Sequence, residues 1–274
     1  MKPTIGIEVH VELKSLSKVF SNSKNNFNDP VNTNVNVIDL AYPGSLPRLN
    51  KEVINMAIKA CLALNCDVTR LMHFDRKNYF YADLPKGFQI TQQDTPIGTN
   101  GYIEIENGKK IRIERLHIEE DTCKSIHSKE TLLNFNRAGV PLLEIVSKPD
   151  IHSGLEAVQY VEKLRETLLY LGISDVKIEE GSMRCDVNVS VSNNDTLGTK
   201  CEVKNIGSIS NVKTAIDYEV SRQTELLKNG EIIKEQTRRY DDKTKTTILM
   251  RYKETGNDYR YFPEPDIPYF EITD

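Results

Sequence analysis

The chain has 274 residues, of which 38% are hydrophobic and 28% charged, and its formal net charge is −4. This length can bury a sizeable core, whereas the lack of an 18-residue apolar run and of a signal pattern argues against a membrane span and against secretion. Five cysteines without a C-x-x-C pair indicate a reducing, intracellular location, and the charge argues against wholesale nucleic-acid coating while permitting a local basic patch.

The first predicted element is a strand over residues 5–13, in which apolar and polar residues alternate. One face carries Ile5, Ile7, Val9, Val11 and Leu13, and the other carries Gly6, Glu8, His10 and Glu12. Two carboxylates around an imidazole, beside a glycine that allows close approach, indicate a site for a hard cation or a phosphate. The alternative is the solvated acidic face of an ordinary strand. Similar faces later in the chain favour the site.

Three later segments have the pattern of amphipathic helices, namely residues 50–64, 153–171 and 211–229. The second has the capping-box pair Ser153 and Glu156 at its start. The Asn/Ser-rich stretch 21–36 predicts a long loop. The remaining segments alternate or break at Gly and Pro, which indicates strands between the helices. This order predicts an α+β fold, with an antiparallel sheet and helices on one side, and residues 1–274 as a single domain.

Several of the predicted strands have polar faces with potential chemistry. Residues 184–191 present Arg184, Asp186, Asn188 and Ser190 on one side, and residues 199–205 present Lys200, Glu202 and Lys204. Residues 140–146 place Glu144 on a strand apolar enough to be buried on both faces, where an unpaired carboxylate is costly. The run 111–121 changes phase between Ile113 and Leu116, which predicts a β-bulge. The pattern leaves open whether Glu119 or Glu120 points the same way as Glu8.

These faces together offer the ligands that Mg²⁺ prefers, which are carboxylates from several elements. If the strands share one sheet, the set is Glu8, His10, Glu120, Glu144 and Glu202. Basic residues that would hold nucleotide phosphates are Arg184, Lys200, Lys204, Arg238, Arg239, Arg251 and Arg260. No G-x-x-x-x-G-K-[ST] or G-x-G-x-x-G motif is present, which argues against a P-loop or Rossmann nucleotide site. ATP would therefore have to bind on the face of a sheet, held by scattered charged residues. For each residue taken singly, the alternative is a solvated surface group.

A series of motifs in chain order resembles one protein family. The motifs are I-G-I-E-V-H-V-E-L (5–13), L-A-Y-P-G-S-L-P (40–47), F-D-R-K-N-Y-F-Y-A-D-L-P-K-G-F-Q-I-T-Q (74–92), L-H-I-E-E-D-T-C-K-S (116–125), F-N-R-A-G-V-P-L-L-E-I-V-S-K-P-D-I (135–151), E-E-G-S-M-R-C-D-V-N-V-S (179–190), E-V-K-N-I-G-S (202–208), Q-T-R-R-Y-D (236–241) and D-Y-R-Y-F-P-E-P-D-I (258–267). With this series, the chain closely resembles the N-terminal catalytic (cradle) part of the B subunit of the aspartyl/glutamyl-tRNA(Asn/Gln) amidotransferase, GatCAB.

The resemblance implies an ATP-dependent ligase that acts in two stages. The side-chain carboxylate of mischarged Glu-tRNA(Gln) or Asp-tRNA(Asn) is phosphorylated, and ammonia then displaces the phosphate to give Gln-tRNA or Asn-tRNA. The implied partners are the amidase subunit, which releases the ammonia from glutamine, the small third subunit of the complex, and the mischarged tRNA. The implied cofactors are ATP and Mg²⁺. The implied fold is like the catalytic domains of glutamine synthetase and guanido kinases, and the implied location is cytoplasmic, or the matrix or stroma of a eukaryotic organelle.

The resemblance also implies roles for single residues. Glu8 and His10 are implied as metal ligands, with Glu120 and either Glu144 or Glu202 completing the set. Lys77, Lys86 and Glu120 are implied as polar lining of the ammonia route. Contacts to ATP or substrate are implied for Arg184, Asp186, Asn188, Lys204 and Arg251.

The chain departs from the family pattern in two ways. Many relatives have a zinc knuckle, whereas this chain has Ser21, Ser23, Asn36 and Asp39 at the cysteine positions, so bound zinc is not expected. The family also continues into helical and tail domains beyond the point where this sequence stops. Either the chain is a fragment, or the remaining part resides elsewhere, or the protein has been reduced. The alternatives to a catalytic subunit are a reduced, non-catalytic scaffold that binds the amidase subunit and a stand-alone ligase of the glutamine synthetase type that activates free glutamate.

Overall fold

The computed structural model describes residues 1–26, 28–127, 129–252 and 259–273, so Phe27 in the predicted loop and Asp258 at the start of the last motif lie outside the described residues. The chain divides into two compact units. The first unit comprises Met1–Val11, Asn100–Glu114 and Ile145–Asn257, and the second comprises Glu12–Thr99, Arg115–Glu144 and Asp258–Asp274.

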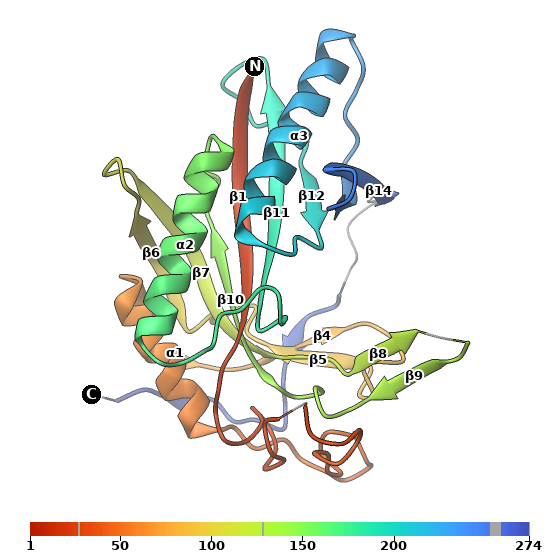
Figure 1. The fold of residues 1–274 in the computed structure, drawn as a ribbon. Coiled ribbons are helices and arrows are strands. Elements are labelled where there is room, and N and C mark those ends of the chain that lie inside the picture. The colour runs from red at the N-terminus through yellow and green to blue at the C-terminus, as the bar shows by residue number, and fades with distance from the viewer. Residues whose placement is uncertain (27, 128, 253–258, 274) are drawn as a thin grey trace. The chain divides into compact units, whose positions relative to one another are not determined.

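The first unit is built on a large sheet (Figure 1). Its strands are β1 (Lys2–Glu12), β6 (Gly98–Glu104), β7 (Lys110–Glu120), β10 (Pro141–Ser147), β11 (Met183–Ser192), β12 (Cys201–Lys204), β13 (Gln236–Asp241) and β14 (Thr246–Tyr252), four of which (β1, β6, β7 and β10) continue into the second unit. Their order is β14-β13-β12-β11-β1-β10-β7-β6. Strand β1 pairs antiparallel with β11, and β11 pairs antiparallel with β12. The predicted α+β class is confirmed.

One strand pair departs from the predicted antiparallel arrangement. Strands β12 and β13 pair in parallel, in register from Cys201↔Gln236 to Lys204↔Arg239. The segment between them contains α3 (Ile209–Lys228), which is long enough to return the chain to the same end of the sheet.

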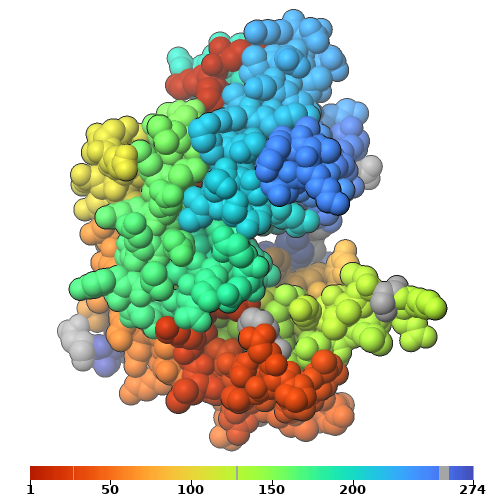
Figure 2. Space-filling view, viewed as in Figure 1, coloured from red at the N-terminus to blue at the C-terminus, as the bar shows by residue number. Residues whose placement is uncertain are grey.

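Helices α2 (Gly154–Tyr170) and α3 pack against each other on one side of this sheet (Figure 1). In the space-filling view their side chains, green for α2 and light blue for α3, lie side by side (Figure 2). Both helices begin after a serine whose hydroxyl accepts a backbone hydrogen bond, Ser153 and Ser208. The capping box is only half formed, because Glu156 accepts from the backbone N–H of His152 instead of that of Ser153.

The apolar faces of the central strands form the core of the first unit. Ile5, Ile7, Val9 and Val11 of β1 are fully buried, as are Val187 and Val189 of β11. The Gln223 side chain of α3 bonds to the backbone of Val189 and Val191, which fixes the helix to this side of β11. The alternation predicted from the sequence is therefore confirmed, and the polar residues of these strands occupy the opposite face.

The second unit contains α1 (Lys51–Ala63) and short strands. These strands are β2 (Asp67–Val68), β3 (Leu71–Met72), β4 (Asp75–Asn78), β5 (Phe88–Thr91), β8 (Lys124–His127), β9 (Thr131–Asn134), β15 (Phe262–Pro263) and β16 (Phe270–Glu271). They form the sheet β15-β4-β5 and the pairs β16-β3 and β8-β9, and β2 pairs with Gly98 and Thr99. Among the described residues, no helix has the length and apolar character needed to cross a membrane.

Strand β7 shows the predicted change of phase. Ile111 and Ile113 are buried at odd positions, whereas Leu116 and Ile118 are buried at even positions. The buried side of the strand therefore changes between Ile113 and Leu116, and the bulge itself stays a prediction.

Candidate active site

The polar face of the first unit aligns predicted site residues from neighbouring strands. Glu8 of β1 is the register partner of Asp186 of β11, and His10 is the partner of Arg184. Asn188 is flanked by Gly6 on one side and Glu202 of β12 on the other. These residues therefore form adjacent rows across three strands, as expected if they share one site.

Hydrogen bonds and ion pairs connect these rows. Asn188 Nδ2 donates to Glu8 Oε1 at 2.7 Å. Lys204 Nζ lies 2.6 Å from Asp186 Oδ2 and 2.9 Å from Glu202 Oε1. The Thr237 hydroxyl donates to Glu202 Oε2 at 3.1 Å, an interaction that no sequence pattern indicated. The two carboxylates that face Lys204 are thus already arranged around a positive charge.

The charge of Lys204 is stabilised by this arrangement. Burial alone would lower the pKa of its ammonium, but the carboxylates of Asp186 and Glu202 outweigh that effect and raise the pKa well above its ordinary value. Lys204 is therefore a cation at physiological pH, held between two acidic side chains.

One buried oxygen on this face has no donor. Among the described residues, Asn188 Oδ1 is buried and makes no hydrogen bond, although the amide nitrogen of the same side chain does. A buried oxygen of this kind is costly unless it binds a donor or a cation. Carboxylate and amide oxygens are the ligands that Mg²⁺ and Ca²⁺ take, so the donor set of this face fits a hard divalent cation.

A cavity of about 360 Å³ lies on the same face, near the N-terminal end of β11. It is lined by His10, Ile178, Met183, Arg184, Cys185, Asp186, Lys204, Asn205 and Ile206. Arg184 and Lys204 give it the basic groups that phosphate oxygens require. Arg251 lies on β14, two strands away from β12, and its register partner is Thr237 of β13. The side chain of Arg251 is exposed.

The second unit has a buried group of acidic and basic side chains around His117. His117 Nε2 lies 3.0 Å from Glu144 Oε2 and 3.7 Å from Glu119 Oε2. Lys77 belongs to the same group: burial lowers the pKa of its ammonium, but Glu119, Tyr261, Tyr259 and Glu144 raise it by more. Glu144 is therefore paired, as the cost of burying a lone carboxylate requires.

Glu120 lies in a different group of the second unit. Its carboxylate contacts Lys86 Nζ and accepts from the backbone N–H of Ile90 at 2.9 Å. Successive residues of a strand point to opposite faces, which explains why Glu119 joins Glu144 and His117 whereas Glu120 joins Lys86. The structure thus gives Glu120 and Glu144, predicted as ligands of one metal, different partners. The sequence left this register open.

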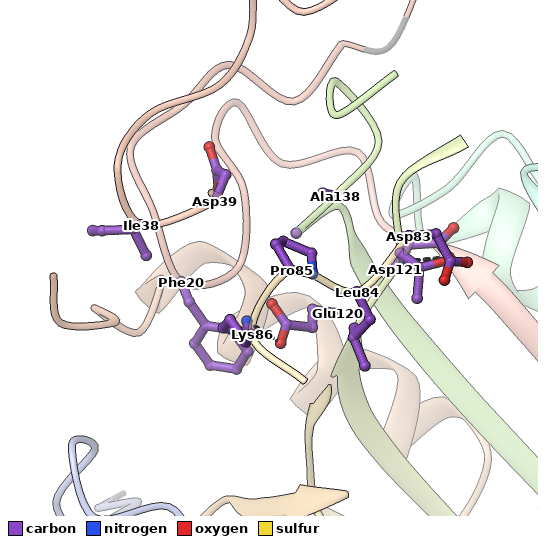
Figure 3. A pocket seen from close by; sticks show the side chains of 12 residues that line it. Phe20, Ile38, Asp39, Asp83, Leu84, Pro85, Lys86, Glu120, Asp121 and Ala138 are labelled. Carbon is purple, nitrogen blue, oxygen red and sulfur yellow. Dashed lines mark hydrogen bonds and ion pairs between the residues drawn. The ribbon is translucent and has the colours of Figure 1, made fainter. Parts of the chain in front are cut away.

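Lys86 and Glu120 line a small cavity (Figure 3). Its volume is about 20 Å³, room for roughly one water-sized molecule. The lining comes from separate segments that include Phe20, Asp39, Asp121 and Gly139. Two of the three residues implied for the ammonia route therefore line one cavity, while Lys77 lies in the His117 group.

Comparison with known proteins places the whole chain in one family. Residues 3–274 match the family model described as GatB/GatE catalytic domain. The chain is 54% identical over 277 residues to the B subunit of the aspartyl/glutamyl-tRNA(Asn/Gln) amidotransferase of Geobacillus thermodenitrificans. It is 56% and 55% identical to the proteins of that name from Lactococcus lactis subsp. cremoris and Streptococcus thermophilus, each over 278 residues.

Each of these alignments covers 98% of this chain and 58% of the relative, so the chain spans less than two thirds of their length. The match to the family model over nearly all residues, together with more than half of the positions identical, shows that the chain belongs to the GatB/GatE catalytic domain family.

Proposed function

We propose that this chain is the catalytic part of the B subunit of a tRNA-dependent amidotransferase. In the proposed reaction, a side-chain carboxylate oxygen of Glu-tRNA(Gln) or Asp-tRNA(Asn) attacks the γ-phosphorus of ATP, and ADP leaves. Ammonia then attacks the resulting acyl phosphate, inorganic phosphate leaves, and a proton is lost to give Gln-tRNA(Gln) or Asn-tRNA(Asn). Phosphorylation is needed because a carboxylate oxygen is a poor leaving group.

The observation that carries this proposal is the aligned polar face of the first unit. Glu8, Asn188 and Glu202 lie on three adjacent strands, and the buried Asn188 Oδ1 has no donor among the described residues. We propose Glu8 and His10, two residues apart on β1, as magnesium ligands of this unit, with Asn188 bonded to Glu8. Glu202 lies two strands away, and its carboxylate already contacts Lys204 and Thr237. When bound, Mg²⁺ would neutralise charge on the phosphoryl group being transferred.

Nucleotide contacts are proposed for the basic and polar residues of the same face. They are Arg184, Asp186, Asn188, Lys204 and Arg251, of which Arg184, Asp186 and Lys204 line the 360 Å³ cavity. Arginine and lysine there would bind phosphate oxygens, and Asp186 would keep Lys204 oriented through their 2.6 Å contact. Glu144 and its neighbour Glu119 offer the same oxygen chemistry in the second unit.

The ammonia route is proposed to run through the second unit, past Lys77, Lys86 and Glu120. The contact between Lys86 and Glu120 at a cavity of one-molecule size supports this assignment. The ammonia would come from glutamine through the amidase subunit, and the small third subunit would complete the complex.

Nucleotide binding by the 274-residue chain tests the first half of the proposal. Titration of Mg²⁺-ATP, followed by calorimetry, should show binding that Glu202→Gln and Asn188→Ala weaken at least about 10-fold. Glu180→Gln is the matched control, because that carboxylate is mostly exposed and pairs only with Lys177 among the contacts described for it. No binding by the unaltered chain would favour the non-catalytic scaffold.

Activity needs the complete complex. In complexes containing the full-length subunit, ATP hydrolysis dependent on mischarged tRNA should be lost in Glu8→Ala and in His10→Ala. Unchanged hydrolysis in both variants would refute the assigned ligands. Activation of free glutamate without tRNA would instead support a small-molecule ligase.

A further inference from the structure

The second unit contains a lysine that is shielded from solvent along its whole side chain. Lys18 is 0% exposed, and its ammonium lies 3.3 Å from Asp39 Oδ2, whose side chain is 3% exposed. Lys18 Nζ also donates to the backbone carbonyl of Phe135 at 3.2 Å. Removing two charges from water costs several kcal/mol per ion, so such a pair persists only where its remaining atoms are well satisfied.

The Asp39 carboxylate is satisfied by three further donors. The Ser21 hydroxyl donates to Oδ1 at 2.7 Å, and the Ser23 hydroxyl donates to Oδ2 at 2.6 Å. The backbone N–H of Asn36 donates to Oδ2 at 3.0 Å. The carboxylate therefore receives four donors when the Lys18 ammonium is included, and it joins two segments that are separate in the sequence.

Those segments are two backbone turns. The first is closed by the hydrogen bond from Lys18 N–H to the Ser23 carbonyl at 3.0 Å, and the second by that from Leu40 N–H to the Asn36 carbonyl at 3.1 Å. Gly139 packs against both charged groups at φ +83°, where a Cβ would lie 3.2 Å from Asp39 Oδ1 and 3.3 Å from Lys18 Cδ. The turns therefore meet in a closely packed polar cluster, defined here as Lys18, Ser21, Ser23, Asn36 and Asp39.

Four members of this cluster, Ser21, Ser23, Asn36 and Asp39, stand where the resemblance to the family implies the cysteines of a zinc knuckle, but their chemistry does not fit zinc. Structural zinc is held by thiolates and imidazoles, whereas these side chains provide two hydroxyls, an amide and one carboxylate. Both hydroxyls already donate to Asp39. The ammonium of Lys18 supplies a positive charge beside the same carboxylate, so a metal ion there would face a buried cation.

We propose that the Lys18–Asp39 ion pair cross-links the two turns in place of a metal ion. The ammonium supplies the positive charge, and Asp39 gathers the donors of both turns. Asp39 lines the same small cavity as Lys86 and Glu120, so the cross-link fixes the position of one of its lining residues (Figure 3). The cross-link belongs to the fold of this segment and does not depend on the proposed reaction.

Metal analysis of the unaltered chain is the first test. The purified chain should contain well under one equivalent of zinc after expression in zinc-supplemented medium. Its melting temperature should not change with a zinc chelator such as 1,10-phenanthroline or with added zinc. One bound equivalent, or a melting temperature that falls with the chelator, would overturn the proposal without any variant.

A double-mutant cycle is the second test. Lys18→Met and Asp39→Asn should each lower the melting temperature, by on the order of 10 °C, because each leaves a buried partner unpaired. The double variant should lose clearly less than the sum of the two shifts. Lys213→Met and Asp217→Asn form the matched control, since that pair is about half exposed and should show almost no coupling. Additive losses at Lys18 and Asp39 would refute the cross-link.

Discussion

Arg76 and Glu264 show how much an ion pair gains from geometry and burial at the scale of single residues. Arg76 Nε and Nη2 donate to the two oxygens of Glu264 at 2.7 and 2.9 Å, and the guanidinium lies 4.1 Å from the ring centre of Phe88. Arg76→Lys keeps the charge but loses the second hydrogen bond and the planar stacking. We expect the free energy of unfolding to fall by about 1 to 3 kcal/mol, measured by urea denaturation.

The chain offers a matched control for this substitution. Arg112 forms the same two-point contact with Asp150, at 2.8 and 2.6 Å, but the Arg112 side chain is 61% exposed whereas that of Arg76 is 20% exposed. Arg112→Lys should therefore change stability much less than Arg76→Lys. Equal losses for the two variants would show that burial does not set the strength of the Arg76 contact.

Helix α3 shows the same principle at the scale of an element, because one buried carboxylate binds two side chains of the helix itself and one of β14. The Glu219 side chain is 0% exposed and accepts from Arg222 Nε at 3.0 Å, Gln223 Nε2 at 2.8 Å and the Thr247 hydroxyl at 3.0 Å. Glu219→Gln would leave Arg222 without its charged partner. We expect it to lower the free energy of unfolding by about 3 to 5 kcal/mol near neutral pH.

The loss at Glu219 should depend on pH in a defined direction. Burial raises the pKa of this carboxyl, but hydrogen bonds from Arg222 and Gln223 and the charge of Arg238 lower it by more, so the pKa lies below its ordinary 4.5. The stabilisation is present above pH 4.5 and is lost as the pH falls through the folded-state value. The difference in the free energy of unfolding between wild type and Glu219→Gln, measured by denaturation at several pH values, should become smaller below pH 4.5. A constant difference would contradict this assignment.

The sequence predicted these elements well, and the reason is local. The helix periodicity, with the capping-box serine Ser153 for the second helix, indicated three helices with ends close to those of α1, α2 and α3, and alternation indicated the buried faces of β1 and β11. Strand direction is not encoded in that periodicity, so the parallel pairing of β12 with β13 was missed. Likewise, the alternation alone did not decide between Glu119 and Glu120, because the register after a change of phase depends on contacts with distant residues such as Lys86.

For the molecule as a whole, the sequence indicated which residue types carry chemistry better than it indicated their partners. Glu8, Asn188 and Glu202 were selected from three separate runs, and the structure places them in adjacent rows of one sheet. The partners Thr237 and His117 were not selected, since an isolated threonine or histidine gives no periodic signal. Lys18 has a side chain whose burial no sequence rule would favour.

The five cysteines provide a test that reports on both units. Cys61, Cys66 and Cys123 lie in the second unit, Cys185 and Cys201 lie in the first, and all five are buried thiols. Burial raises the pKa of Cys123 to about 11 and that of Cys201 to about 12. For Cys123, a rise from 9.0 to about 11 lowers the reactive thiolate fraction roughly 100-fold at pH 8.

We therefore expect the native chain to react with N-ethylmaleimide very slowly at every cysteine, and a reductant to leave its melting temperature unchanged. In guanidinium chloride all five thiols should label quickly, which mass spectrometry would show as five added groups. Because the thiols are distributed over both units, measuring the labelling of each cysteine at increasing denaturant concentration shows at which concentration each unit unfolds. Rapid native labelling of any one cysteine would place that thiol at the surface and contradict the packing described for its unit.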